Sequence, residues 1–139
     1  MHSSRTAIVV LLFGCGILAG QSAPQIKKTP VKETSAASGK EMYVQYCASC
    51  HGKEGKGDGP AAAALKTPPP NLTTLTARNK GTFPELRVAQ MIQGEDTVAA
   101  HGSRDMPIWG ELFREREGRS TMKLRVANLT DYLKSLQAK

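Results

Sequence analysis

The sequence has few aromatic residues. Among its 139 residues are one Trp, three Tyr and three Phe, so aromatic side chains make up only 5% of the chain. A chain of this length is expected to form one compact domain, and a domain with so few rings has a thin apolar core. We therefore expect something other than side chains to fill part of that core.

Cysteine is scarce as well, and the three cysteines are an odd number, which a framework of disulfides explains poorly.

The chain is 40% hydrophobic and 22% charged, which excludes both a disordered tail and a polytopic membrane protein. The net charge of +7 is spread along the chain rather than gathered in one block. Nucleic-acid binding is therefore not expected.

A long hydrophobic run is also missing. The uncharged stretch Ala7–Gly20 (AIVVLLFGCGILAG) is shorter than the roughly 20 apolar residues that a membrane-spanning helix needs, and it is typical of a secretory signal peptide. We assign residues 1–22 to a leader, either a signal peptide cleaved after Ser22 or a retained membrane anchor. Lipidation at Cys15 is a third alternative, because Leu12-Phe13-Gly14-Cys15 is loosely similar to a bacterial lipobox. All three predict export to the bacterial periplasm.

Residues 23–38 contain two prolines and small polar residues, with no helical or alternating apolar period. This composition predicts a flexible linker, which would tether the protein to the membrane if the leader is retained. The folded domain is predicted to span residues 39–139.

The most informative stretch is Cys47-Ala48-Ser49-Cys50-His51, because C-x-x-C-H is the attachment signal of a c-type haem. Two thiols at this spacing add to the two vinyl groups on one edge of the porphyrin, which places the adjacent His51 under the iron. The motif predicts one haem c, bound covalently through Cys47 and Cys50. A cofactor that cannot dissociate suits an exported protein.

Three alternative roles for this motif fit the sequence less well. A thioredoxin-like redox pair needs a strand–helix context, whereas a helical pattern and a glycine-rich run flank this motif. A disulfide between the two cysteines leaves His51 unexplained. A zinc site needs four ligands, and only His101 and Cys15 are left to complete it.

The runs CASCHGKEGKGDGPAA, PPPNL and MPIWG, followed by a helix ending in YLKSL, together resemble the class I monohaem cytochromes c. The resemblance extends from Gly39 to about Gln137. It implies an all-α fold with three to five helices wrapped around one haem. It also implies that a proline carbonyl, from Pro70 or else Pro69, bonds the second ring nitrogen of His51. Trp109 is expected in the core near the haem, with its indole N–H within reach of a propionate.

Hydrophobic periodicity supports several helices. One is predicted between Gly39 and Cys50, and a capping box at Thr82-x-x-Glu85 starts another that ends at Gly94. The clearest helix lies near the C-terminus, with apolar residues at alternating steps of four and three: Met122, Val126, Leu129, Leu133 and Leu136. The resemblance implies that the first and last helices cross, with Gly39 and Tyr43 against Tyr132.

The sixth ligand of an iron held by His51 decides the function. Met106 matches the methionine ligand of the resembled family, and it lies in a non-helical stretch far along the chain from His51. His101, five residues earlier, is the competing ligand, and a vacant position is a further alternative. We favour Met106, because a lone His of this kind is more often a surface residue than a ligand. A thioether ligand raises the reduction potential relative to a second imidazole.

With both axial positions filled, no site is left for a substrate or for oxygen, and no nucleophile–base pair occurs in the sequence. We therefore predict a one-electron carrier rather than an enzyme. Its partners would be exported or membrane redox proteins of a respiratory chain, such as a membrane oxidase or dehydrogenase complex. The alternative is a haem peroxidase or gas-binding sensor in which the sixth position is open or held by His101.

Overall fold

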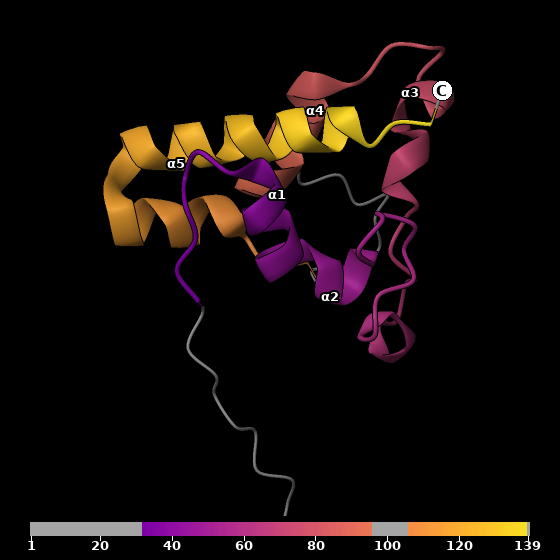
Figure 1. The fold of residues 1–139 in the computed structure, drawn as a ribbon, viewed down its shortest axis with the longest axis horizontal. Helices are drawn as coiled ribbons and strands as arrows, with labels where there is room; N and C mark the ends of the chain where they lie inside the picture. Colours follow the sequence, from indigo (N-terminus) through magenta and orange to yellow (C-terminus); the bar gives the residue numbers. More distant parts are fainter. Residues whose placement is uncertain (1–31, 96–105, 139) are drawn as a thin grey trace, which may run out of the picture. The chain divides into compact units, whose positions relative to one another are not determined.

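The computed structural model describes residues 32–95 and 106–138 of the chain. The secondary structure of these residues is helical, and no strand occurs among them. This confirms the predicted all-α fold. Figure 1 shows the helices in chain order.

Three helical segments follow one another without a break at the start: α1 (Gly39–Met42), the π-helix η1 (Tyr43–Cys47) and α2 (Ala48–His51). Two short 3₁₀ turns come next, η2 (Ala62–Ala64) and η3 (Leu72–Thr74), and η3 leads directly into α3 (Leu75–Arg78). The last two helices are α4 (Glu85–Gln93) and α5 (Trp109–Ser135). The helix predicted from Gly39 therefore forms, with a π-helical turn inside it that the periodicity did not indicate.

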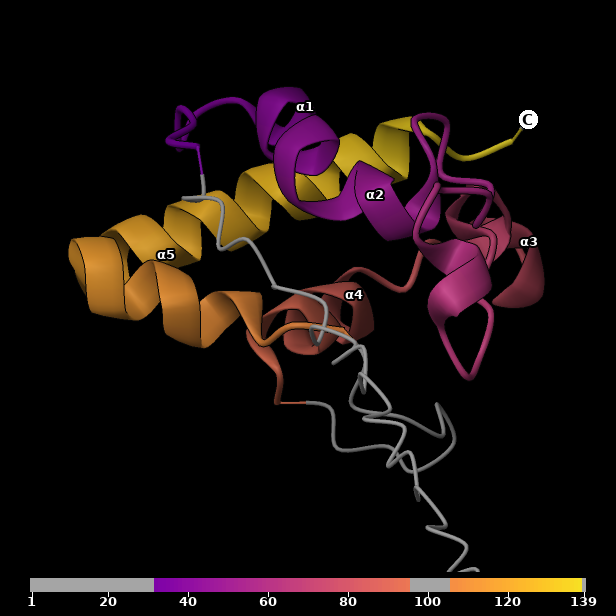
Figure 2. The ribbon, with the colours of Figure 1, turned by 90° about the horizontal axis from the view of Figure 1, so that it is seen from below.

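Helix α5 is bent back on itself at Gly118. This glycine has φ 82° and ψ 170°, a conformation outside the helical region that side-chain-bearing residues rarely adopt. It divides α5 into a first limb, residues 109–117, and a second limb, residues 119–135. Figures 1 and 2 show the two limbs running back alongside each other. The guanidinium of Arg125 on the second limb lies 5.3 Å from the centre of the Phe113 ring on the first.

Helix α1 crosses the second limb of α5 at Gly39. A Cβ atom at this position would collide with the backbone carbonyl oxygen of Asn128 and would lie 2.9 Å from the Cβ of Tyr132. One turn further, the rings of Tyr43 and Tyr132 have centroids 5.3 Å apart. The predicted crossing of the first and last helices is confirmed at these residues.

The core of the described residues is small and draws on α1, η1, α2, α4 and both limbs of α5. Trp109 packs against it, stacked on Tyr46 at a centroid distance of 5.1 Å. The start of α5 is held close to the end of α4, because a Cβ at Gly110 would lie 2.7 Å from the Cα of Gln93. The buried apolar residues are Met42, Tyr43, Tyr46, Ala48, Ile92, Phe113, Val126, Leu129 and Leu133.

The described end of the predicted linker is packed on the helices. Thr34 is buried, and Arg125 donates hydrogen bonds to its Oγ1 (2.9 Å) and to its backbone carbonyl (2.8 Å). The Thr34 hydroxyl is also bonded to the Tyr46 hydroxyl at 2.8 Å. The packed structure therefore begins before Gly39. These contacts are polar and distant in sequence, so they leave no periodic pattern.

The capping box predicted at Thr82 does not form. Helix α4 begins at Glu85 without a side-chain cap at its start. The backbone of Thr82 is already engaged in a turn, because its N–H donates to the carbonyl of Asn79 (3.1 Å) and its carbonyl accepts from Asn79 Nδ2 (2.7 Å). The predicted end of the helix at Gly94 is confirmed.

The C-terminal residues are bonded to η3 and α3, next to which the C-terminus lies in Figure 1. The N–H of Ala138 donates to the Thr73 carbonyl (2.9 Å), and the Gln137 side chain bonds both the Leu72 carbonyl and the Thr76 N–H. No helix in the two described ranges is long and apolar enough to cross a membrane.

Candidate functional site

The C-x-x-C-H residues lie where η1 passes into α2. Cys47 is the last residue of η1, while Cys50 and His51 belong to α2. Both thiols are free and partly buried, and one helical turn separates them. Burial raises the pKa of the Cys47 thiol to about 12, with a smaller contribution from the neighbouring Cys50. Cys47 is therefore a neutral thiol over the physiological pH range.

The ring of His51 is kept in its neutral form. Burial lowers its pKa, while the backbone of Pro70 acts in the opposite direction and favours the charged ring. Proline has no N–H, so the group involved is the Pro70 carbonyl. The contact falls short of a standard hydrogen bond, since His51 Nδ1 is buried without such a partner in the described structure. A neutral imidazole has the free lone pair that a metal ligand requires.

A glycine-rich loop, residues 52–59, closes the end of α2. Each carbonyl from Ala48 to His51 accepts a hydrogen bond from an N–H in or just after this loop. The donors are Gly52 to Ala48 (2.9 Å), Ala61 to Ser49 (2.9 Å), Gly59 to Cys50 (3.2 Å) and Gly57 to His51 (2.8 Å). The carbonyls that a helix end usually leaves unpaired are thus satisfied, and the turn carrying both thiols and the imidazole is held in one conformation.

The proline run lies directly against this loop. A Cβ at Gly57, whose φ is 84°, would collide with the carbonyl oxygen of Pro69, and the Pro70 carbonyl oxygen would lie 3.4 Å from it. The Leu72 N–H donates to the Gly55 carbonyl at 2.7 Å. The structure therefore brings the PPPNL segment beside the C-x-x-C-H turn, as the resemblance implied.

The remaining candidate residues lie at the start of α5. Met106 is half-buried and precedes α5 by three residues. Ile108 packs against the end of α4, since a Cβ at Gly94 would lie 2.5 Å from its Cγ2. Trp109 is partly buried against the core. The competing ligand His101, and Cys15 of the leader, lie outside the described residues.

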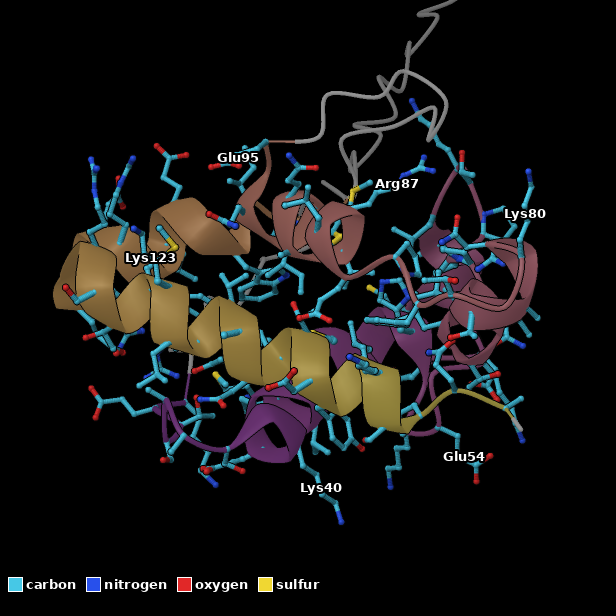
Figure 3. The ribbon with its side chains drawn as sticks, turned by 90° about the horizontal axis from the view of Figure 1, so that it is seen from above. Lys40, Glu54, Lys80, Arg87, Glu95 and Lys123 are labelled. Atoms are coloured by element: carbon cyan, nitrogen blue, oxygen red, sulfur yellow. The ribbon has the colours of Figure 1, made fainter. Side chains whose placement is uncertain are left out.

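The loops that follow the C-x-x-C-H turn carry an excess of positive charge. Between His51 and α4 the exposed cations are Lys53, Lys56, Lys66, Arg78 and Lys80, against the acids Glu54 and Asp58. Lys56 is paired with Glu54 at 2.6 Å. Figure 3 shows Lys80 pointing away from the ribbon. We call these loops and their exposed cations the basic loop face.

Comparison with known protein families agrees with this geometry. Residues 34–119 match the family described as cytochrome c oxidase, cbb3-type, subunit III. The chain belongs to this family of c-type cytochromes. Neither the comparison with curated proteins nor that with solved structures gave a match.

The matched range of this cytochrome extends from the packed residue Thr34 to just beyond the bend of α5. It contains the C-x-x-C-H turn, the proline run, Met106 and Trp109. Cytochrome c domains carry a haem c and exchange electrons with redox partner proteins. The prediction of a c-type cytochrome, made from the sequence motifs, is confirmed by the family match.

The residues of the turn fit a haem c. The donor set consists of two thiols one turn apart and an adjacent imidazole held neutral, and the buried Nδ1 of that imidazole faces no standard partner in the described residues. Cys47, Cys50 and His51 are the residues that would hold the group, with the Pro70 carbonyl beside the imidazole.

The sequence patterns did not reveal one residue of the site. The Tyr43 side chain is completely buried, and its hydroxyl donates a 2.8 Å hydrogen bond to the carbonyl of Gly52, directly after His51. From the sequence, Tyr43 is expected only at the crossing of the first and last helices, against Tyr132. A tyrosine where packing alone would accept phenylalanine is the signal that a polar contact was needed there.

Proposed function

We propose that this cytochrome is a one-electron carrier whose haem c is attached through Cys47 and Cys50 and ligated by His51 and Met106. When bound, the haem supplies one-electron chemistry between the ferrous and ferric states. The main support for the proposal is the C-x-x-C-H turn, which contains two thiols and a neutral His51. Hydrogen bonds from the following loop to the carbonyls of this turn hold it in place. In this site His51 presents a lone pair, and the Pro70 carbonyl orients its ring.

Met106 is proposed as the sixth ligand because of its position. It is half-buried, it directly precedes Pro107, and the α4–α5 junction that follows is tightly packed. Such packing fixes the point from which Met106 can reach a flat cofactor. A filled sixth position leaves no site for a substrate, which supports a carrier rather than an enzyme. Trp109, held against Tyr46, is proposed to line the same cofactor.

The test of this ligation compares Met106→Ala with His101→Ala in the purified ferric protein. Methionine-ligated ferric haem has a weak red absorption band that bis-histidine and five-coordinate haems lack. We expect the wild type and His101→Ala to show this band and Met106→Ala to lose it. Met106→Ala should also bind added imidazole at a several-fold lower concentration than the wild type. A band that survives in Met106→Ala would exclude Met106. A wild type that lacks the band and that, once reduced with dithionite, binds carbon monoxide rapidly would favour a sensor or peroxidase.

We further propose that the partner is a membrane redox complex with an acidic docking site, which the basic loop face and the oxidase-subunit family support. Export to the periplasm, with residues 1–22 as leader and residues 23–38 as tether, belongs to the same proposal.

Lys53→Glu and Lys80→Glu should slow electron transfer at low salt, whereas Lys40→Glu, on α1, should leave the rate unchanged. Fractionation of wild-type and Cys15→Ser cells distinguishes a lipid anchor from a cleaved or retained leader.

A further inference from the structure

Tyr43 holds both ends of the C-x-x-C-H turn. Its backbone carbonyl accepts a hydrogen bond from the N–H of Ala48, the first residue of α2, across the π-helical turn. Its hydroxyl donates to the carbonyl of Gly52, the residue that directly follows the helix. One residue therefore brackets the whole segment that carries Cys50 and His51.

The bond to Gly52 differs from the bonds that close the rest of this turn. The carbonyls from Ala48 to His51 are paired only with backbone N–H groups in or just after the following loop. The Gly52 carbonyl accepts a hydrogen bond from the Gly55 N–H within the loop (3.2 Å) and, in addition, one from a side chain of the preceding helix (2.8 Å). Gly52 is buried, so if this hydroxyl were removed no bulk water would replace it, and its carbonyl would keep only the longer bond from Gly55.

Tyr43 is itself held from two sides. Its ring lies against Tyr132 of the second limb of α5, with centroids 5.3 Å apart, and the close crossing at Gly39 fixes the start of the same helix. Because the hydroxyl is buried, its hydrogen bond is stronger than the same bond would be in water. The second limb of α5 therefore supports the Tyr43 side chain, which in turn is hydrogen-bonded to Gly52, the residue next to His51.

We propose that Tyr43 is a positioning residue, whose hydroxyl sets the orientation of His51 by anchoring the Gly52 carbonyl. This inference rests on the proposed function, in which His51 binds the iron. It concerns the hydroxyl alone, because the packing of the ring is preserved in phenylalanine. Without the hydroxyl, the Gly52 carbonyl keeps only its bond from Gly55 within the loop and loses its bond to the preceding helix, so that His51 and the loop from Gly52 to Gly57 shift together.

The test compares Tyr43→Phe with Tyr132→Phe in the full-length protein carrying its haem. The two changes each remove one hydroxyl from the same ring pair, but only Tyr43 has a bond to Gly52. We expect the hyperfine-shifted proton resonances of His51 in the ferric protein to move in Tyr43→Phe and to stay in place in Tyr132→Phe. We also expect the Gly57 amide, which is bonded to the His51 carbonyl, to exchange with deuterium about tenfold faster in Tyr43→Phe alone.

Either of two results would overturn the inference. One is that Tyr43→Phe and Tyr132→Phe have the same His51 resonances and the same Gly57 exchange rate. The other is that Tyr43→Phe loses its helical circular dichroism, because the hydroxyl would then support the whole fold rather than the turn. A wild type that is purified in folded form without covalent haem would contradict the proposed function. The inference about Tyr43 would still be tested in that case, by comparing Gly57 exchange in the wild type and in Tyr43→Phe.

Discussion

At the scale of single residues, Arg125 ties three segments of the chain together. Its side chain is 5% exposed and forms a bidentate pair with Glu117, at 2.7 and 2.9 Å, across the two limbs of α5. It also donates two hydrogen bonds to Thr34. The result is one polar network that joins the N-terminal segment to both limbs of the bent helix.

Removal of this arginine should be costly. Arg125→Ala leaves the buried Thr34 carbonyl without this donor and the Glu117 side chain, which is 33% exposed, without its partner, and an unpaired buried polar group typically costs about 1–3 kcal/mol of unfolding free energy. Urea unfolding followed by circular dichroism measures this loss. Arg116, which pairs with Glu33 at 3.4 Å on the surface, provides the matched control, and Arg116→Ala should cost no more than about 1 kcal/mol. Equal losses in the two variants would show that the Arg125 network does not stabilise the fold.

Tyr43 makes the stability of the protein sensitive to alkaline pH. Burial is the main cause that raises its pKa above the ordinary value of 10.0, with smaller contributions from Cys47, Tyr132 and Asp58. The folded state therefore keeps the phenol proton where the unfolded chain releases it. Below the unfolded pKa the contribution to stability is complete, and it is lost as the pH rises from about 10 toward the folded pKa.

We accordingly expect the melting temperature of the wild type to fall more steeply above pH 10 than that of Tyr43→Phe, which has no phenol to ionise at this position. Thermal unfolding between pH 8 and pH 11 gives both curves. Tyr132→Phe serves as the control and should retain the steep fall. Parallel curves for the wild type and Tyr43→Phe would refute a buried, hydrogen-bonded phenol at residue 43.

The individual residues also show which parts of the site were predictable. Cys47, Cys50 and His51 could be identified because covalent attachment requires a short, fixed spacing in the sequence. The contacts of Arg125 could not, since its partner Thr34 is 91 residues away and polar contacts leave no period. The sequence indicated Pro70, with Pro69 as the alternative, and Pro70 as the partner of His51 stays a prediction, since His51 Nδ1 has no standard hydrogen bond in the described residues.

At the scale of the elements, the crossing of α1 and α5 depends on the absence of a side chain at Gly39. A Cβ there would meet the Asn128 backbone carbonyl, which cannot turn aside as a flexible side chain could. Gly39→Ala should therefore lower the unfolding free energy by about 1–3 kcal/mol, as overpacking does in other cores. Lys40→Ala, at the exposed neighbouring position, should change it by less than about 0.5 kcal/mol. If denaturant unfolding shows the same unfolding free energy for Gly39→Ala and the wild type, the two helices do not come as close together at Gly39 as this contact requires.

The elements themselves were predicted unevenly. The second limb of α5 follows from its apolar period, and Gly94 ends α4 as expected. The fold-back at Gly118 was not predicted, because one glycine within a charged run does not show whether a helix ends or reverses there. The π-helical turn of η1 was also missed, because the single extra residue barely alters an apolar period of so few residues.

At the scale of the whole molecule, three of the aromatic residues that the structure describes are gathered in one place. Tyr46 and Trp109 stack at 5.1 Å, and Phe113 lies 5.6 Å from Tyr46, beside the turn that holds Cys47. The buried apolar residues of the described chain are otherwise few. A bound porphyrin would add the apolar bulk that so small a core lacks.

The fold should therefore depend on the cofactor. We expect the double variant Cys47→Ser, Cys50→Ser to show far-UV circular dichroism with much reduced helical signal at 25 °C and no cooperative thermal transition. Ser49→Ala, an exposed change within the same motif, should behave as the wild type. A double variant that melts cooperatively at the wild-type temperature would show that the polypeptide folds without haem.

The proposed function depends above all on covalent attachment at the C-x-x-C-H turn, and the intact mass of the denatured protein tests it most directly. The protein is purified from the periplasm of cells with a haem-attachment system and treated with a thiol-alkylating reagent in denaturant. We predict the mass of the polypeptide plus one haem, with Cys47 and Cys50 protected from alkylation. A mass without haem, with both cysteines alkylated, would contradict the proposed function.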